Sequence, residues 1–322
     1  MSGEVLEKVY ALVDSMLKES EHLVISYFGG EPLLEYRSVV RPLIEYAENA
    51  AVQAGKTVAF SFTTNGFLIT PEMAEYFAAH NVRQMQITLD GGREAHNATR
   101  ISRKKDSFGT ITENVRLLLG HGIFVTVRVN VTEKNIGSCT DIVEWIKGLT
   151  DDEKKYLGVN VQQVWQTCGK EDIELQIDNL LDSICECGVF ASPQIIDNMR
   201  SMCYADELYT IVVNSDGNLF KCTGSDFTGE NSQTNIFADN YREILESRFR
   251  KNIAKRFSNS LCRECTIFPL CMGGCVRTVE QNQTDDYCIK NSVKDREKHI
   301  MNIVKDSIRR DTVINQRNET QQ

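Results

Sequence analysis

The 322-residue sequence predicts an α/β protein, with a partial parallel β/α barrel in its first half and a cysteine-rich domain after it. Three observations predict this fold. Amphipathic segments alternate with short β-branched or aromatic runs, polar groups follow one predicted strand after another, and seven of the 11 cysteines lie from Cys203 to Cys288. Repeated β/α units imply parallel strands, because each return crossover needs a helix.

The elements of the first half follow one another as helix and strand. Val5, Val9 and Leu12 share one face of a helix over residues 4–18, and a strand over 22–28 ends abruptly at two glycines. The alternation continues with helices over 35–54, 71–79, 110–119 and 139–149, and with strands over 57–63, 84–89, 123–131 and 158–165.

The placement of polar groups favours a closed or partly closed barrel over a doubly wound open sheet. Residues 29–31 follow the first predicted strand, 63–66 the second and 90–92 the third, while Arg128 and Asn130 lie near the end of the fourth. The carboxyl ends of parallel strands converge on one face, where barrel enzymes hold their active sites. Taken singly, these residues are also ordinary turn signals. Four of them in the same structural position indicate a site.

The second half has fewer regular elements. A helix is expected over 173–187, and two short strands over 207–213 and 218–221 are joined by a hairpin turn at 214–217. A charged helix over 293–309 and a frayed tail over 311–322 end the chain. The predicted domains are a partial barrel over 1–190, a cysteine-rich domain over 191–290, and a C-terminal helix and tail over 291–322.

Composition narrows the class of protein. The 36 Lys and Arg against 45 Asp and Glu give a net charge of −9, which argues against nucleic-acid binding through phosphates. No run approaches the ~20 apolar residues of a membrane-spanning helix, and no signal peptide is recognisable. We therefore expect a cytoplasmic protein with no membrane partner. In a reducing cytosol, clustered cysteines indicate metal or redox chemistry.

The cysteine spacing favours iron–sulfur clusters. The pattern C-x2-C-x5-C-x3-C starts at Cys262 and ends at Cys275, with Cys203 and Cys222 before it and Cys288 after it. Zinc ligands usually come as paired C-x2-4-C knuckles, and only the first pair has that form. Seven thiols exceed one four-ligand site and fall one short of two. Zinc sites with stray thiols, or inert cysteines, are the alternatives.

These residues resemble the radical S-adenosylmethionine (SAM) enzymes that carry a SPASM domain, of the peptide or protein maturase type. The seven cysteines match the SPASM pattern, Tyr27–Pro32 resembles the GGE motif, and residues 64–66 and 87–91 resemble the next two strand ends. The resemblance reaches from near the start to Cys288. It implies a partial (β/α)6 barrel of the radical SAM type that lacks its first strand, followed by a SPASM domain.

The resemblance also implies cofactors. Two auxiliary [4Fe-4S] clusters are expected. The first would be held by three cysteines, Cys203, Cys222 and Cys275. The second would be held by four, Cys262, Cys265, Cys271 and Cys288. The first cluster then keeps an open iron or takes Cys185 or Cys187. We favour the interpretation of those last two as thiols on a buried helix face.

Contacts to SAM are implied as well. Gly29, Gly30 and Glu31 would meet its methionine amino group, Thr88 stands where the family often has serine, and Arg100 would face its carboxylate, unless it is an exposed loop arginine.

Other polar residues near these motifs are weaker candidates. His96 is expected to orient a loop by hydrogen bonding rather than to act in catalysis, and Asn97 accompanies it. Thr223 replaces the aspartate of sulfatase-maturating members, and Asp226 is either a base or, as we favour, a loop carboxylate. The catalytic residues are not assigned.

One defining motif of the family is not found. The 322 residues contain no Cys-x3-Cys-x2-Cys, and neither Cys139 nor Cys168 has the spacing to replace it. The sequence is therefore expected to be truncated at its N-terminus, through a misplaced start or a split gene, or to be a genuine short product. The complete form would bind SAM on a third cluster, take electrons from flavodoxin or ferredoxin, and modify a peptide or protein side chain by a thioether or carbon–carbon link or a related oxidation. The alternative is a cluster module without enzymatic activity, which binds a peptide or a partner.

Overall fold

The computed structural model describes residues 1–100, 106–164, 172–193, 203–275, 277, 287–288 and 293–319. Trp165 and Cys168 lie outside the described residues. The chain forms two compact units, and neither is continuous in sequence: unit 1 comprises Met1–Glu21, Glu45–Lys56 and Arg200–Asn302, and unit 2 comprises His22–Ile44, Thr57–Met199 and Ile303–Gln322. The domain boundaries expected from the sequence remain a prediction.

Unit 2 contains a six-stranded parallel sheet. Its strands are hydrogen-bonded in sequence order and are β1 (His22–Tyr27), β2 (Thr57–Thr64), β3 (Val82–Leu89), β4 (Phe124–Val131), β5 (Leu157–Gln163) and β6 (Phe190–Ser192). The predicted α/β class with parallel strands is confirmed. β6, which the sequence analysis did not predict, extends the sheet through three register pairs with β5.

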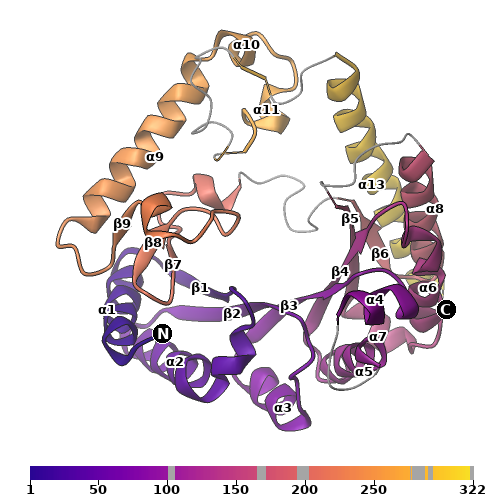
Figure 1. Ribbon diagram of the computed structural model, residues 1–322, viewed down its shortest axis with the longest axis horizontal. Helices are drawn as coiled ribbons and strands as arrows, with labels where there is room; N and C mark the ends of the chain where they lie inside the picture. The colour runs from indigo at the N-terminus through magenta and orange to yellow at the C-terminus, as the bar shows by residue number, and fades with distance from the viewer. Residues whose placement is uncertain are drawn as a thin grey trace. The chain divides into compact units, whose positions relative to one another are not determined.

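Helices cover the outer, convex face of this curved sheet (Figure 1). They are α3 (Pro71–Ala79), α5 (Ser107–Gly120), α6 (Thr140–Lys147) and α8 (Asp172–Glu186), with α4 (Arg93–Thr99) and α7 (Asp151–Lys155) as short additions. The predicted helix over 35–54 is instead three pieces: a 3-10 turn Pro32–Glu35, a π turn Tyr36–Val40 and α2 (Arg41–Ala54). Pro32 and Pro42, which have no N–H to donate, lie at the first turn of the 3-10 segment and of α2.

The two faces of the sheet differ in chemistry. Side chains such as Phe60, Met85, Ile87 and Val127 are at most 1% exposed and form the core. Alternate residues on the opposite face are polar. One row of register partners across β3 to β6 is Thr88, Arg128, Asn160 and Ser192. Because partners in register share a face, this face of the sheet is polar. Thr88 and Arg128 are half-buried there, whereas Asn160 and Ser192 are fully buried, and Ser192 donates a hydrogen bond to Asp306.

Unit 1 contains α1 (Gly3–Glu19), part of α2, and a small antiparallel sheet of β7 (Val212–Val213), β8 (Asn218–Phe220) and β9 (Thr234–Asn235). Tyr10 of α1 stacks on Tyr46 of α2, with ring centroids 4.1 Å apart. The predicted turn at 214–217 joins β7 and β8 as expected. The long helix α9 (Tyr241–Ser258), which was not predicted, is followed by α10 (Ser260–Arg263) and α11 (Phe268–Cys271).

Two further predictions are wrong. The strand expected over 207–213 is reduced to two residues, because the buried Lys221 ammonium binds the carbonyls of Glu207, Leu208 and Thr210 and so bends that segment around itself. The tail expected to fray from residue 311 is helical: α13 spans Val293–Glu319, and Val313 is buried.

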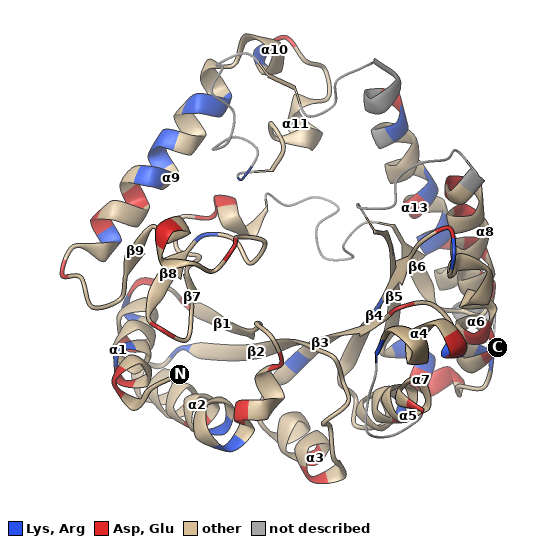
Figure 2. Cartoon of the chain, in the orientation of Figure 1, with Lys and Arg blue, Asp and Glu red and all other residues tan. Residues whose placement is uncertain are grey.

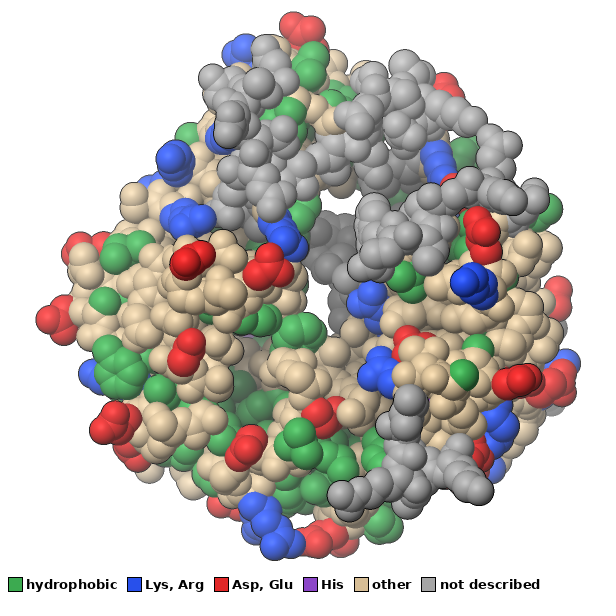
Figure 3. All heavy atoms as spheres, in the orientation of Figure 1, with side chains coloured by type: hydrophobic (Ala, Val, Ile, Leu, Met, Phe, Trp, Pro, Cys, Tyr) green, Lys and Arg blue, Asp and Glu red, His purple; other side chains and the backbone are tan. Residues whose placement is uncertain are grey.

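The described surface is mixed in charge. On the face seen in Figure 3, the coloured Lys and Arg side chains are interspersed with Asp and Glu. Within the described residues, no helix combines the length and apolarity that a membrane span requires.

Candidate functional site

Glu31 joins the loop after β1 to the end of β2. Its Oε1 accepts hydrogen bonds from the Leu33 N–H at 3.1 Å and from the Thr64 hydroxyl at 2.7 Å. Its Oε2 accepts from the Asn65 N–H at 2.8 Å. The structure therefore brings together two of the segments on which the sequence analysis relied. All of these contacts lie within unit 2.

The glycines of these loops have different backbone requirements. Gly29 has φ +134° and Gly66 has φ +73°, backbone conformations that residues other than glycine rarely adopt. A Cβ on Gly66 would also lie 2.8 Å from the Ile87 side chain. Gly30 has no such φ, and among the described residues no atom beyond its chain neighbours lies within 4 Å of a Cβ built on it. The backbone at Gly30 is thus open to a close approach by a ligand.

Asp90 connects the ends of β3 and β4. Its Oδ2 accepts from Arg100 Nε at 2.7 Å, and its Oδ1 accepts from Asn130 Nδ2 at 2.9 Å. Asn130 Oδ1 in turn accepts from Arg128 Nε at 3.0 Å. Burial would raise the pKa of Asp90, but the hydrogen bonds from Arg100 and Asn130 outweigh it and lower that pKa. Arg100 is thus held by an ion pair, and is 43% exposed.

His96 orients the loop after β3, as expected. Its Nδ1 accepts the Asp90 N–H at 3.1 Å, so it is the neutral ring that the geometry requires. The residue is fully buried, and burial lowers the pKa of the imidazole. Asn97 fastens the start of α5: its Oδ1 accepts from the Phe108 N–H at 2.9 Å.

The seven cysteines from Cys203 to Cys288 are all described, and unit 1 arranges them in two sets. Burial raises the pKa of the Cys203 thiol, and the nearby Cys222 and Cys275 raise it further. Burial also raises the pKa of the Cys262 thiol, and here the neighbours with the same effect are Cys271, Cys288 and Cys265. We call Cys203, Cys222 and Cys275 the first set, and Cys262, Cys265, Cys271 and Cys288 the second set. They have the same members as the two groups that the resemblance implied.

A left-handed turn separates Cys271 from Cys275. Met272, Gly273 and Gly274 have φ values of +51°, +76° and +84°. Three consecutive residues with positive φ reverse the chain direction, and a non-glycine residue among them is uncommon. The turn accounts for two cysteines of one motif joining different sets.

Among the described residues, no three or more His, Cys, Asp or Glu side chains could hold a single metal ion together. A zinc ion draws thiolates to about 2.3 Å from itself. A four-iron cube instead binds each thiolate at a separate iron, which spreads the sulfurs apart.

Other candidate residues lie as follows. Cys185 is buried on α8, and burial raises the pKa of its thiol to about 11, whereas Cys187 is half-buried. Asp226 is a loop carboxylate, 74% exposed, that pairs with Arg277 at 3.5 Å, which agrees with the interpretation favoured from the sequence. Thr223 binds the Tyr204 hydroxyl through its own hydroxyl at 2.5 Å and through its N–H at 2.9 Å.

Comparison with known proteins identifies the first part of the chain. Residues 4–146 match the family model of the radical SAM superfamily. The chain contains a radical SAM domain. It is 23% identical over 316 residues to the cysteine-type anaerobic sulfatase-maturating enzyme of Clostridium novyi, which covers 86% of this chain and 79% of that protein. It is 21% identical over 293 residues to the radical SAM cyclopropyl synthase TigE of Paramaledivibacter caminithermalis, covering 86% of this chain and 58% of that one.

Solved structures of radical SAM proteins share the fold. Native anSMEcpe with bound AdoMet matches with a TM-score of 0.67 at 19% identity, over 99% of this chain and 91% of that one. Streptococcus suis SuiB bound to precursor peptide SuiA matches with a TM-score of 0.57 at 16% identity, over 87% of this chain and 67% of that one. At these identities the likeness shows the fold. The polar loops after β1 to β4 lie within residues 4–146, the part of the chain that matches the radical SAM family model.

Sequence reasoning missed the residues that hold the site together. The buried pair of Arg256 and Asp206, and the fully buried Asn259, were not singled out. Arg256 lies in a helix rich in Lys and Arg (Figure 2), so no local signal separates it from its exposed neighbours. Only its burial reveals it.

Proposed function

We propose that this chain is an iron–sulfur protein of the radical SAM maturase type, which modifies a peptide or protein side chain. Two auxiliary [4Fe-4S] clusters would be held by the two cysteine sets. The observation that carries the proposal is the division of the seven thiols, in which Cys203 has Cys222 and Cys275 as neighbours while Cys262 has the other three. With a Cys-x3-Cys-x2-Cys segment supplied, a third cluster and SAM would provide a carbon radical that abstracts a hydrogen atom.

The surroundings of the thiols fit clusters. Cys222 Sγ accepts hydrogen bonds from the Gly224 N–H at 3.2 Å and from the Tyr204 hydroxyl at 3.8 Å, and such donors stabilise a thiolate ligand. Arg256 Nε is buried and has no hydrogen-bond partner within the described residues. Its positive charge acts to lower the pKa of Cys262, against the larger effect of burial. A buried donor beside a thiol suits an anionic cluster.

We assign the SAM contacts to Gly29, Gly30, Glu31, Thr88 and Arg100. The open space at Gly30 supports a contact through the backbone. Oε1 of Glu31 accepts two hydrogen bonds and Oε2 accepts one, so the carboxylate holds the loop and keeps an acceptor site on Oε2 for the amino group of SAM. Arg100 is held by Asp90 in a fixed position from which the rest of its guanidinium can meet a carboxylate.

The proposed substrate is a peptide or a protein segment. Relatives are named as sulfatase-maturating enzymes, and SuiB was solved with a precursor peptide. The polar row of Thr88 and Arg128 on the open face of the sheet would suit the amides and polar side chains of such a substrate. Thr223 in place of aspartate favours a thioether or carbon–carbon link over sulfatase maturation. A flavodoxin or ferredoxin in the cytoplasm would supply electrons.

Anaerobic reconstitution with iron and sulfide tests the clusters. We expect about eight irons per chain, since each auxiliary cluster has four. Cys203→Ala and Cys262→Ala should each reduce this to about four, while Cys139→Ala, a buried cysteine in neither set, should leave it unchanged. A colourless protein that contains zinc alone would refute the proposal.

The second candidate function is a cluster module without enzymatic activity. It is favoured by the fact that no Cys-x3-Cys-x2-Cys occurs in the 322 residues. The chain should be incubated with SAM and dithionite, both alone and with the segment encoded in frame upstream of Met1. Release of 5'-deoxyadenosine only by the longer protein supports the maturase. Release by neither protein supports the module, and release by the chain alone would contradict both our account of the missing motif and the module.

A further inference from the structure

Arg256, near the end of α9, connects two separate segments of unit 1. Its Nη1 lies 2.7 Å from Asp206 Oδ2, and both side chains are only 3% exposed. Its Nη2 donates to the Gly274 carbonyl at 2.8 Å. The aliphatic stem of Arg256 lies beneath Gly273, where an added Cβ would approach Arg256 Cγ to 3.3 Å.

Both of these segments carry cysteines of the first set. The Asp206 N–H donates to the Cys203 carbonyl at 2.7 Å, within the 3-10 turn Tyr204–Asp206 that begins beside Cys203. Gly274 immediately precedes Cys275. Tyr204 in the same turn binds Thr223 and Cys222. Arg256 therefore fixes the backbone on either side of the first set.

Asn259, three residues further along, does the same for the second set. The residue is fully buried, and its Nδ2 donates to the Tyr287 carbonyl at 2.7 Å. Its Oδ1 accepts from the Leu261 N–H at 3.0 Å and from the Cys262 N–H at 3.3 Å. Because Tyr287 immediately precedes Cys288, Asn259 links the segments that carry the first and last thiols of this set.

We propose that Arg256 and Asn259 are positioning residues for two different iron–sulfur clusters, Arg256 for the Cys203, Cys222 and Cys275 site and Asn259 for the Cys262, Cys265, Cys271 and Cys288 site. The proposal rests on the proposed function, in which these thiols bind clusters. The physical basis is the distance in sequence between ligands. Thiols so far apart must be brought together before a cluster can bind, and each buried side chain closes such a loop in advance.

Single variants with matched changes test this division. Arg256→Gln keeps a polar side chain but removes the charge and the reach to both partners. Asn259→Asp keeps the oxygen that accepts from Cys262 and removes the donor to Tyr287. Arg250→Gln is the control, because Arg250 lies on the same helix, is 71% exposed and pairs with Glu246. After anaerobic reconstitution, we expect about four irons in each of the first two variants and about eight in the control.

Combination with cysteine variants identifies which cluster is lost. Arg256→Gln added to Cys203→Ala should leave the iron content at about four, because both changes remove the same cluster. Arg256→Gln added to Cys262→Ala should reduce it to nearly zero. Asn259→Asp should give the opposite pattern. The cluster retained in each single variant reports that the domain is still folded, and its EPR spectrum after reduction should match that of the corresponding cysteine variant.

The outcomes distinguish the failure of the positioning roles from the failure of the proposed function. Wild-type protein without iron–sulfur clusters would refute the proposed function, and this inference with it. Wild-type protein with about eight irons, and variants that both keep all of them or both lose all of them, would overturn the positioning roles alone. Arg256→Lys retains the charge beside Asp206 but cannot also reach Gly274, and should recover part of the lost iron.

Discussion

The carboxylate of Glu31 accepts the backbone N–H of Asn65 at 2.8 Å, which fastens the loop after β1 to the loop after β2. The same carboxylate binds the Thr64 hydroxyl. A glutamate in the proposed SAM-binding motif is therefore a structural link between two strand ends. Its conformation is determined before any ligand binds.

Glu31→Gln is expected to destabilise the fold. An amide can present only one acceptor oxygen, and its NH2 group would face either the Asn65 N–H or the donors at Leu33 and Thr64. Leaving a part-buried donor without its acceptor costs about 1–3 kcal/mol. Urea unfolding of the variant measures this loss. Glu72→Gln, an exposed residue in the first turn of α3, is the control and should change stability by less than about 0.5 kcal/mol.

The two glycines before Glu31 should respond differently to alanine. Gly29 has φ +134°, so Gly29→Ala should lower the free energy of unfolding by about 1–3 kcal/mol. Gly30→Ala meets no atom of the described residues within 4 Å beyond its chain neighbours and should leave stability unchanged. If Gly30 approaches SAM through its backbone, Gly30→Ala in a protein that also carries a Cys-x3-Cys-x2-Cys segment should weaken SAM binding in equilibrium dialysis without a loss of stability. Unchanged SAM affinity would remove Gly30 from the proposed contacts.

Most of the first half could be predicted from the sequence, because each strand is a short apolar or β-branched run that ends at a turn residue. Pro71–Ala79 was predicted to the residue, since Thr70 caps it and Pro71 starts it. The segment over 207–213 could not be predicted, because its β-branched residues are overridden by one distant ammonium, that of Lys221. A tertiary contact of this kind leaves no local pattern.

In the candidate site, too, some residues could be predicted from the sequence and others could not. The cysteine spacing revealed the seven proposed ligands, and strand ends revealed Glu31 and Asp90. The residues that connect them, Arg256 and Asn259, are ordinary helix and turn residues in sequence. Their partners Asp206 and Tyr287 lie far away along the chain. Only the folded structure pairs them.

Arg100→Ala is expected to reduce stability at neutral pH and to have a smaller effect in acid. Arg100 lowers the pKa of Asp90 through both its hydrogen bond and its charge, so that pKa rises when Arg100 is removed. A carboxyl whose pKa is lowered in the fold contributes stability above its ordinary pKa of about 3.9, and loses it as the pH falls through the folded value. Because Arg100 is 43% exposed, we expect a loss of at most about 1 kcal/mol at pH 7.

Unfolding in urea at pH 7 and at pH 3 measures the difference. The loss caused by Arg100→Ala should be smaller at the lower pH, because Asp90 becomes protonated in the folded protein as the pH falls. Arg250→Ala, which removes an exposed pair with Glu246, serves as the control for a general charge effect. An equal loss at both pH values would show that Arg100 acts through packing rather than through Asp90.

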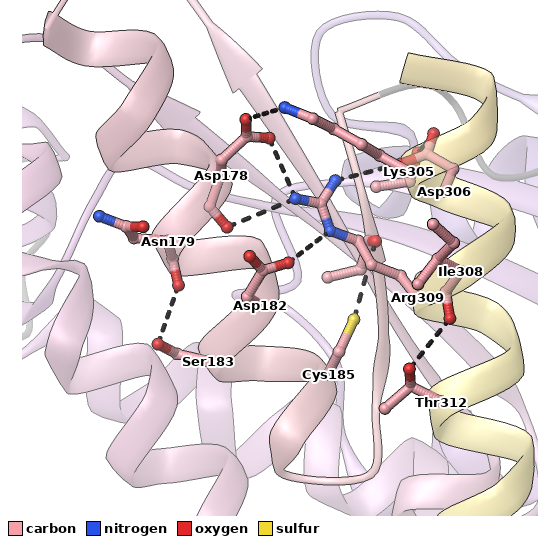
Figure 4. Close-up of polar contacts among 12 residues, drawn as sticks. Asp178, Asn179, Asp182, Ser183, Cys185, Lys305, Asp306, Ile308, Arg309 and Thr312 are labelled. Carbon is pink, nitrogen blue, oxygen red and sulfur yellow. Dashed lines mark hydrogen bonds and ion pairs between the residues drawn. The ribbon is translucent and has the colours of Figure 1, made fainter. Parts of the chain in front are cut away.

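Arg309→Met should be the most destabilising single change in α13. Arg309 is 6% exposed and lies between three carboxylates: Asp182 at 2.8 Å, Asp178 at 3.0 Å and the fully buried Asp306 at 3.4 Å (Figure 4). Removing one partner from a buried ionic group leaves charge uncompensated and costs about 3–5 kcal/mol. Lys305→Met is the control, since Lys305 contacts Asp178 but is 42% exposed, and should cost at most about 1 kcal/mol.

The loss in Arg309→Met should grow with pH. Burial raises the pKa of Asp306 even while Arg309 is present to oppose it, and without Arg309 that pKa rises further. A carboxyl with a raised pKa contributes stability below its ordinary value of about 3.9 and loses it as the pH rises through the folded value. The melting temperatures of variant and wild type should therefore diverge from pH 5 to pH 8. A constant difference across this range would mean that the protonation of Asp306 does not depend on Arg309, and that Arg309 stabilises α13 through Asp178 and Asp182 alone.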